Sequence, residues 1–180
     1  MSGRPPSQSA LVVEVADSEA LVGHWRRRHD VAGGGMPAHI SLLFPFRSPD
    51  AIAQVELETL TRLAAQTHRH RFALVAVDEF SEAIYLRPYP DNWFRNLTQR
   101  LFEAFPDCPP YGGARSDSVP HLTVAQTSGG EAHEVLRLAI DAAIAPALPV
   151  ACEATALSLF ISENGSDNGQ WTLAQRFPFA

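Results

Sequence analysis

The chain has 180 residues, of which 46% are hydrophobic and 19% charged, and its formal net charge is −6. These values are typical of one globular domain. The chain has no apolar run of roughly 18 residues, which argues against membrane binding. It also shows no secretory signal and no paired cysteine spacing, so we expect a cytoplasmic protein without disulfides. The acidic balance argues against a long nucleic-acid partner, which favours a basic stripe, and favours a short or terminal phosphate ester instead. We expect a monomer.

The first half of the chain alternates strands and helices after a polar N-terminal segment. Residues 1–9 are expected to form a disordered tail. Asp17 or Ser18 can cap the first helix, and Ser48 followed by Pro49 signals the second. The expected elements are a strand at 10–16, a helix to about 28, a strand at 38–44, a helix to about 66, and a hairpin of strands at 71–78 and 83–87.

The second half repeats much of this order. Asp91 opens a helix that Pro106 ends, and a loop over 107–120 leads to the next strand. The remaining expected elements are a strand at 121–126, a helix at 131–144 and a last strand pair at 150–161 and 170–177. One strand is thus followed by two copies of helix, strand, helix, strand, strand, which indicates an internal duplication.

Two short strings of similar composition occur in matching strands of the two copies. They read His39-Ile40-Ser41 and His121-Leu122-Thr123, each with a histidine two residues before a hydroxyl. Residues i and i+2 of a strand share a face and lie about 6–7 Å apart. Each string therefore presents one imidazole and one hydroxyl on the same side. The alternate residues are expected to face the core, namely Ile40, Leu42, Phe44, Leu122 and Val124.

The pattern of short strands joined by hairpins and separated by helices predicts an α+β fold with largely antiparallel sheets. In such a fold, one face of each sheet packs against helices and the other face can line an open cleft. We therefore expect two sheets around a central cleft, with the helices on the outer faces. The histidines and hydroxyls of the two strings would meet in that cleft.

The paired strings suit chemistry on a phosphodiester held between them. Hydrolysis needs a group that removes a proton from water and a group that delivers a proton to the leaving oxygen. Histidine suits both roles because its pKa is near 6.5. We therefore predict His39 and His121 as catalytic residues, with the hydroxyls of Ser41 and Thr123 donating to the phosphate. We expect no metal and no other cofactor.

Three further residues are weaker candidates for substrate binding. Tyr111, in the loop before the second string, and Phe46, after the first, can stack on a base. Arg115 can offset the charge of a phosphate.

Other polar residues are expected to be structural. The only tight basic cluster spans residues 26–28 in a predicted helix, where a solvated face is the simplest explanation. His133 lies in a polar helical stretch and is expected at the surface. Asp78 and Glu79 precede a turn and are interpreted as turn residues.

The two strings resemble the His-x-Thr/Ser-x signature, or HxTx motif, of the two-histidine (2H) phosphoesterase superfamily, and within it the bacterial 2′-5′ RNA ligase and cyclic phosphodiesterase group. The resemblance spans residues 10–177, with serine in place of the commoner threonine in the first string. It implies a bilobal duplicated fold, here a single domain over residues 10–180 with lobes joined near 88–91. It also implies metal-independent hydrolysis of 2′,3′-cyclic phosphates of nucleotides or RNA ends, or cleavage and formation of 2′-5′ linkages, as in RNA processing.

Two alternatives stay open on the sequence. A non-catalytic module could bind nucleotide phosphates in the same cleft, although hydroxyls and an arginine would then suffice without the histidines. A metal hydrolase could use the histidines as ligands. The residues also leave open the physiological substrate, the direction of the reaction, the position of the product phosphate and which histidine is the acid.

Overall fold

The structure is a computed structural model that describes residues 7–33, 35–113, 119–162 and 170–180. Its helices are α1 (Glu19–His29), α2 (Gln54–Ala65), α3 (Asn92–Ala104) and α4 (Gly130–Ile144). Its strands are β1 (Gln8–Glu14), β2 (His39–Leu43), β3 (His70–Phe80), β4 (Ala83–Tyr89), β5 (Leu122–Gln126), β6 (Val150–Ala154), β7 (Ala156–Ser162) and β8 (Trp171–Pro178).

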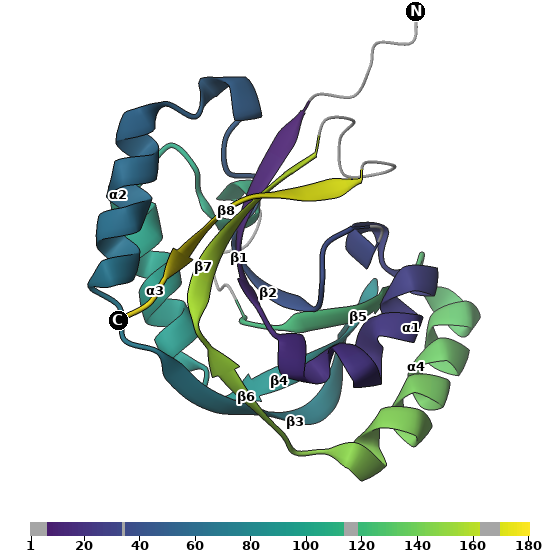
Figure 1. The fold of residues 1–180 in the computed structure, drawn as a ribbon. Helices are drawn as coiled ribbons and strands as arrows, with labels where there is room; N and C mark the ends of the chain where they lie inside the picture. Colours follow the sequence, from purple (N-terminus) through teal and green to yellow (C-terminus); the bar gives the residue numbers. More distant parts are fainter. Residues whose placement is uncertain (1–6, 34, 114–118, 163–169) are drawn as a thin grey trace, which may run out of the picture.

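The strands form two four-stranded antiparallel sheets (Figure 1). The first sheet has the order β2-β1-β7-β8, and the second has the order β5-β4-β3-β6. The two strands that carry the histidine strings, β2 and β5, are therefore edge strands in equivalent positions. This arrangement confirms the predicted α+β fold with two antiparallel sheets.

The helices lie in two pairs on either side of the sheets, with α1 and α4 on one side and α2 and α3 on the other (Figure 1). Each helix that precedes a histidine string packs against the strand that carries the other string. Helix α1 contacts β5, and helix α3 contacts β2. This exchange brings the two edge strands together, and β2 contacts β5 directly.

The connection between the lobes differs from the expectation. Residues 88–91 lead from β4 to α3, and both β4 and the following β5 belong to the second sheet. The chain instead passes from the first sheet to the second through α2, and returns at Thr155. The predicted single strand at 150–161 is divided there, because Ala154 pairs with His70 of the second sheet whereas Ala156 pairs with Pro178 of the first.

The tail expected over residues 1–9 is too long by at least two residues. Gln8 and Ser9 belong to β1, where Ser9 pairs with Ile161. The Ser9 hydroxyl donates to the backbone oxygen of Arg47 at 2.6 Å, and the Ser9 carbonyl accepts from the Phe46 amide at 2.8 Å. These bonds hold the start of the strand against the chain that leaves β2.

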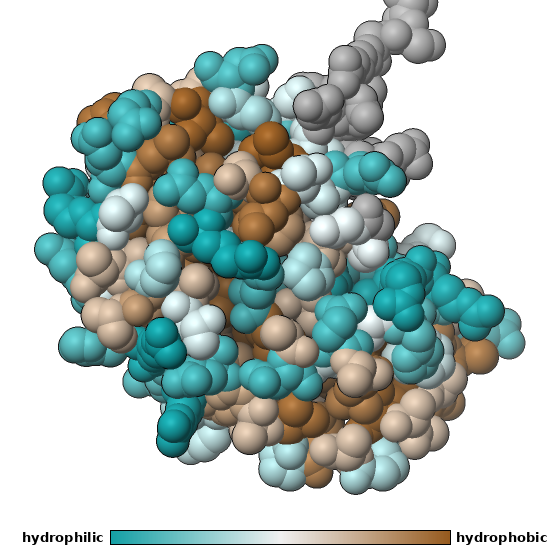
Figure 2. All heavy atoms as spheres, viewed as in Figure 1, coloured by the Kyte–Doolittle hydropathy of each residue, from teal (hydrophilic) through white to brown (hydrophobic). Residues whose placement is uncertain are grey.

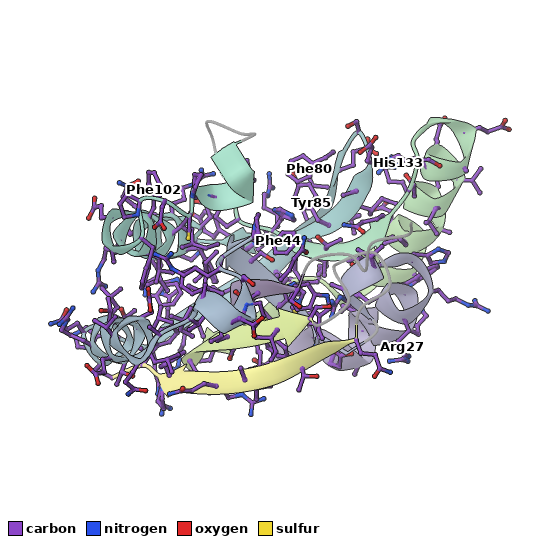
Figure 3. The ribbon with its side chains drawn as sticks, turned by 90° about the horizontal axis from the view of Figure 1, so that it is seen from above. Arg27, Phe44, Phe80, Tyr85, Phe102 and His133 are labelled. Atoms are coloured by element: carbon purple, nitrogen blue, oxygen red, sulfur yellow. The ribbon has the colours of Figure 1, made fainter. Side chains whose placement is uncertain are left out.

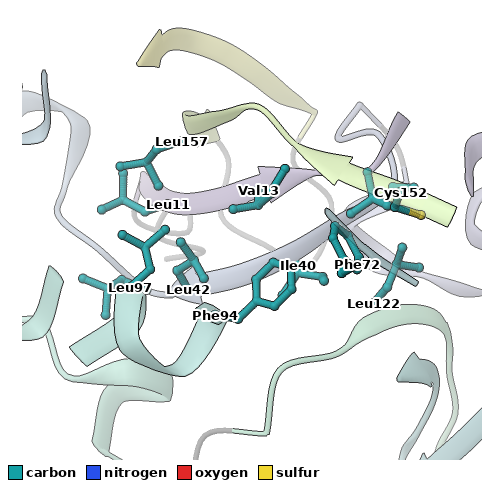
Figure 4. Packing of buried hydrophobic residues seen from close by; sticks show 14 of the residues in the cluster. Leu11, Val13, Ile40, Leu42, Phe72, Phe94, Leu97, Leu122, Cys152 and Leu157 are labelled. Atoms are coloured by element: carbon teal, nitrogen blue, oxygen red, sulfur yellow. The ribbon is translucent and has the colours of Figure 1, made fainter. Parts of the chain in front are cut away.

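A single main core receives side chains from both sheets (Figure 4). The prediction from strand alternation is confirmed for Ile40, Leu42, Leu122 and Val124, each of which is at most 1% exposed. Leu11 and Val13 of β1 pack into the same cluster. Burial of these side chains orients the intervening histidines and hydroxyls toward the other face of their strands.

The described surface is mixed in character. On the face shown in Figure 2, hydrophilic and hydrophobic residues are interspersed. The exposed large apolar residues include Val55, Val135 and Leu138. None of the described helices is both long and apolar enough to cross a membrane.

Candidate active site

The structure brings the two histidine strings into one cavity of about 240 Å³, which we call the active-site cavity. His39 and Ser41 reach it from β2, whereas His121 and Thr123 reach it from the start of β5. All four side chains are partly exposed, in contrast to the buried residues between them. The cavity therefore collects two imidazoles and two hydroxyls from opposite sheets.

Neighbouring strands fix the orientation of both strings. In the first sheet, Val12 of β1 pairs with Ser41, and Glu14 pairs with His39. In the second sheet, Tyr85 of β4 pairs with Thr123. Directly paired residues of antiparallel strands share a face. The pairing with the neighbouring strand therefore fixes which side each string faces, in agreement with the burial of its alternate residues.

The two imidazoles are held in the same way. The Nδ1 atom of His39 lies 2.8 Å from the carbonyl oxygen of Pro37, and Nδ1 of His121 lies 2.7 Å from that of Val119. A carbonyl oxygen only accepts hydrogen bonds, so each Nδ1 carries the hydrogen. The neutral rings therefore keep an unprotonated Nε2, which is the nitrogen able to take up a proton.

A buried ion pair lies behind His39. Arg26 is only 2% exposed, and its Nη2 atom is 2.9 Å from a carboxylate oxygen of Asp30. The same guanidinium donates to the Met36 carbonyl at 3.1 Å and lies 3.4 Å from Nδ1 of His39. The expectation that residues 26–28 form a solvated face is therefore wrong for Arg26, because α1 turns this side chain inward toward the loop before β2.

Burial is the largest cause that lowers the pKa of His39, and the Arg26 guanidinium adds to it, giving a value of about 4. Asp30 and the hydrogen bond to Pro37 oppose this shift. The charge of His121 also lowers the pKa of His39. With this lowered pKa, His39 is neutral at pH 7.

An apolar wall closes the side of the active-site cavity that belongs to the first sheet. It includes Ala10, Met36, Phe44 and Trp171. The rings of Phe44 and Trp171 meet edge to face, with centroids 5.9 Å apart. Phe44 was expected in the core, but β2 ends at Leu43, so the alternation of the strand does not extend to it. Trp171 gave no local signal, because it reaches the cavity from the other end of the chain.

Two aromatic rings surround His121 on the second sheet. Phe80 and Tyr85 stack with centroids 4.4 Å apart, and they lie 5.1 and 5.2 Å from the His121 ring. Figure 3 shows Phe80 and Tyr85 close together, with His133 beyond them on α4. In the sequence, the alternation of side chains along the two strands of this hairpin was the pattern that could have placed both rings on one face.

Of the three weaker candidates, the structure places only the side chain of Phe46. Phe46 is 5% exposed and packs against Phe105, with ring centroids 5.1 Å apart, so it belongs to the core. The side chain of Tyr111 and the whole of Arg115 lie outside the described residues. Among the described residues, no three His, Cys, Asp or Glu side chains are grouped so that they could hold a metal ion.

The sequence matches one family model. The model of the 2′-5′ RNA ligase superfamily matches residues 13–166, which include both histidine strings. Among curated proteins, no sequence match is found.

Solved structures with a similar fold include three proteins of low sequence identity. Escherichia coli LigT complexed with 3′-AMP has 18% identity and a TM-score of 0.62, with 97% of this chain and 99% of that chain covered. A protein described as a phosphoesterase has 16% identity, a TM-score of 0.60 and the same coverage. A Thermus thermophilus protein, TT0787, has 17% identity and a TM-score of 0.63, with 96% and 97% covered. At these identities the likeness concerns the fold.

Proposed function

The chain belongs to the 2′-5′ RNA ligase superfamily, and from this premise we propose that it is a metal-independent phosphoesterase. Its proposed substrates are 2′,3′-cyclic phosphates of nucleotides or RNA ends, or 2′-5′ RNA linkages. The observation that carries the proposal is the convergence of His39, Ser41, His121 and Thr123, from two different sheets, on one cavity.

The anchoring of the rings supports acid–base catalysis. With both Nδ1 atoms bonded to backbone carbonyls, each Nε2 is the atom that exchanges a proton. One histidine takes a proton from water as the water oxygen attacks phosphorus, and the other gives a proton to the leaving ribose oxygen. The phosphorus–oxygen bond to the leaving ribose breaks, and a phosphomonoester is left. The hydroxyls of Ser41 and Thr123 donate to the non-bridging oxygens, where negative charge develops.

The ligands of a similar fold support a nucleotide substrate. LigT has been solved in complex with 3′-AMP, NADP⁺, ATP and phosphate. In this chain, the apolar wall with Phe44 and Trp171 adjoins the two histidines, so a base can lie against it while the phosphate lies between the imidazoles.

The decisive assay uses 2′,3′-cyclic mononucleotides and 2′-5′-linked dinucleotides with a chelator present. We expect His39→Gln and His121→Gln to lower turnover by about 10²- to 10⁴-fold, because each removes a proton-transfer group. His68→Gln, the same change at an exposed histidine outside the cavity, is the matched control.

Full turnover by His121→Gln would contradict the proposal. Ligand binding without any product from the wild-type protein would instead favour a nucleotide-phosphate binding module. Activity that is lost with the chelator and restored by zinc would indicate a metal hydrolase.

A further inference from the structure

A second cavity of about 380 Å³ continues from the active-site cavity on the far side of His121. His121, Thr123 and Gln126 line both cavities, so a ligand with its phosphate between the histidines can extend from one into the other. The remaining lining residues of the second cavity lie at the turn of the β3–β4 hairpin and at the start of the β5–α4 connection. They are Phe80, Glu82, Ala83 and Thr127.

The hydroxyl of Thr127 is held in place at the edge of the second cavity. Its Oγ1 lies 2.7 Å from Nδ1 of His133 and accepts from the Gly129 amide at 3.2 Å. The Thr127 amide donates to the Glu82 carbonyl at 2.9 Å, which ties the connection to the hairpin turn. The side chain is therefore oriented by two contacts and its backbone by a third, yet the residue still lines the cavity.

The partner of Thr127 is itself fixed. His133 is 8% exposed, and its Nε2 lies 3.0 Å from a carboxylate oxygen of Glu79, which is also 3.5 Å from Nε of Arg137. The expected surface position of His133 and the turn role of Glu79 are both wrong, because α4 packs on β3 and buries the imidazole between them. A carboxylate, an imidazole and a hydroxyl thus form a chain of contacts that ends in the second cavity.

The chemistry of the second cavity suits a neutral group. Among the described residues that line it, none is Lys or Arg, and Glu82 is the one carboxylate. That carboxylate disfavours a second phosphate. The hydroxyl of Thr127 and the amide of Gln126 can exchange hydrogen bonds with a sugar, while the ring of Phe80 offers an apolar surface to a base.

We propose that the second cavity binds the second nucleoside of a substrate that has a nucleoside on each side of one phosphate. A dinucleoside monophosphate or the last linkage of an RNA chain has this form, whereas a 2′,3′-cyclic mononucleotide leaves the second cavity empty. Thr127 is the specificity-determining residue, through a hydrogen bond to a sugar hydroxyl. This inference rests on the proposed function and selects its substrate class.

The test compares two substrates in each variant. Thr127→Val removes the hydroxyl and keeps the shape, and we expect the ratio of kcat/KM for 2′-5′-linked ApA to that for 2′,3′-cyclic AMP to fall about tenfold. Thr61→Val, which changes an exposed threonine on α2, is the matched control and keeps the wild-type ratio.

A second variant covers the case in which Thr127→Val does not fold because His133 loses its partner. Ala83→Leu narrows the second cavity from a partly exposed position, and it should also lower the ratio. Ala65→Leu, at an exposed position on α2, controls for the added side chain.

Failure of the nucleoside site and failure of the phosphoesterase activity would give different results. If the wild-type protein cleaves both substrates and both variants keep its ratio, the second cavity is not the nucleoside site and the phosphoesterase proposal stands. If the wild-type protein cleaves neither, the proposed function fails. Calorimetry then tests whether the second cavity binds a nucleoside. If Thr127→Val binds 2′-5′-linked ApA more weakly than the wild-type protein does, and its affinity for 3′-AMP falls less, the nucleoside site is still supported.

Discussion

At the scale of single residues, the two histidines of the cavity have the same backbone anchor, and a buried ion pair lies beside His39. Both histidines bond through Nδ1 to the carbonyl two residues earlier. Among the described residues, the buried guanidinium of Arg26 lies 3.4 Å from Nδ1 of His39, with Asp30 as its counter-charge. A bound phosphate would oppose the effect of that guanidinium on the imidazole, so occupancy of the site is expected to favour the charged form of His39.

The lowered pKa of His39 predicts a pH dependence of stability. The unfolded chain protonates this histidine near pH 6.5, whereas the folded protein does so only near pH 4. Between these values the unfolded state binds more protons, so the free energy of unfolding rises as pH rises from 4 to 6.5, by at most about 3 kcal/mol. Urea unfolding of the wild type and of His39→Gln at a series of pH values measures this contribution as their difference.

Taking the difference between the unfolding free energies of the two proteins removes the contribution of other groups with a lowered pKa, such as His70. The groups that act on His39 itself are Arg26, Asp30, His121 and Glu14. A difference that stays constant from pH 4 to 8 would show that the folded protein does not depress the pKa of His39.

At the scale of elements, the loop between α1 and β2 is shaped by a close approach to β8. Gly35 has a φ of +149°, and a Cβ added there would lie 2.5 Å from the carbonyl oxygen of Trp171. This contact brings the loop, which contributes Asp30 and Met36 to the active-site cavity, against the strand that contributes Trp171. The loop thus joins one wall of the cavity to the histidine string that follows it.

Gly35→Ala is therefore expected to lower the free energy of unfolding by about 2 kcal/mol, because both the φ angle and the backbone contact resist a Cβ. The NMR signal of the Trp171 indole should shift as β8 moves. Gly23→Ala is the contrasting variant, since the atoms nearest to its new Cβ are the ends of the Glu19 and Arg27 side chains rather than backbone atoms of another element. Equal stability of the two variants would argue against this packing.

At the scale of the whole molecule, the two lobes share one main core rather than two. The same buried cluster contains Leu11 and Leu42 of the first sheet and Leu86 and Leu122 of the second. The chain also crosses between the sheets twice, through α2 and at Thr155. Neither sheet therefore has a complete core of its own, and we expect the lobes to unfold together.

Leu42→Ala tests this cooperativity. Removal of a side chain that is 1% exposed is expected to lower the free energy of unfolding by about 2–5 kcal/mol. Hydrogen exchange should accelerate alike for slowly exchanging amides of β1 and of β4, because one opening reaction exposes both. Leu138→Ala, at a side chain that is 53% exposed, is expected to change stability by less than about 0.5 kcal/mol. Acceleration confined to β1 would show that the lobes open independently.

The sequence by itself determined most of the strands and helices, the two histidine strings and the side of each strand that carries them, but not the division of the strand at 150–161. Strand alternation is a local property, so Ile40 and Val124 could be assigned to the core from a few neighbouring residues. The family signature is equally local. The catalytic roles of His39 and His121 stay predictions until the variants are measured.

Only the tertiary structure decided how the rest of the site is assembled. Arg26 behind His39, Trp171 in the apolar wall and the Glu79–His133–Thr127 chain join segments that are distant in sequence. The crossing between the sheets at Thr155 also depends on distant residues, because β6 pairs with β3 at His70 and β7 pairs with β8 at Pro178. Such contacts follow from the packing of both sheets on one core, and no periodicity within a single segment encodes them.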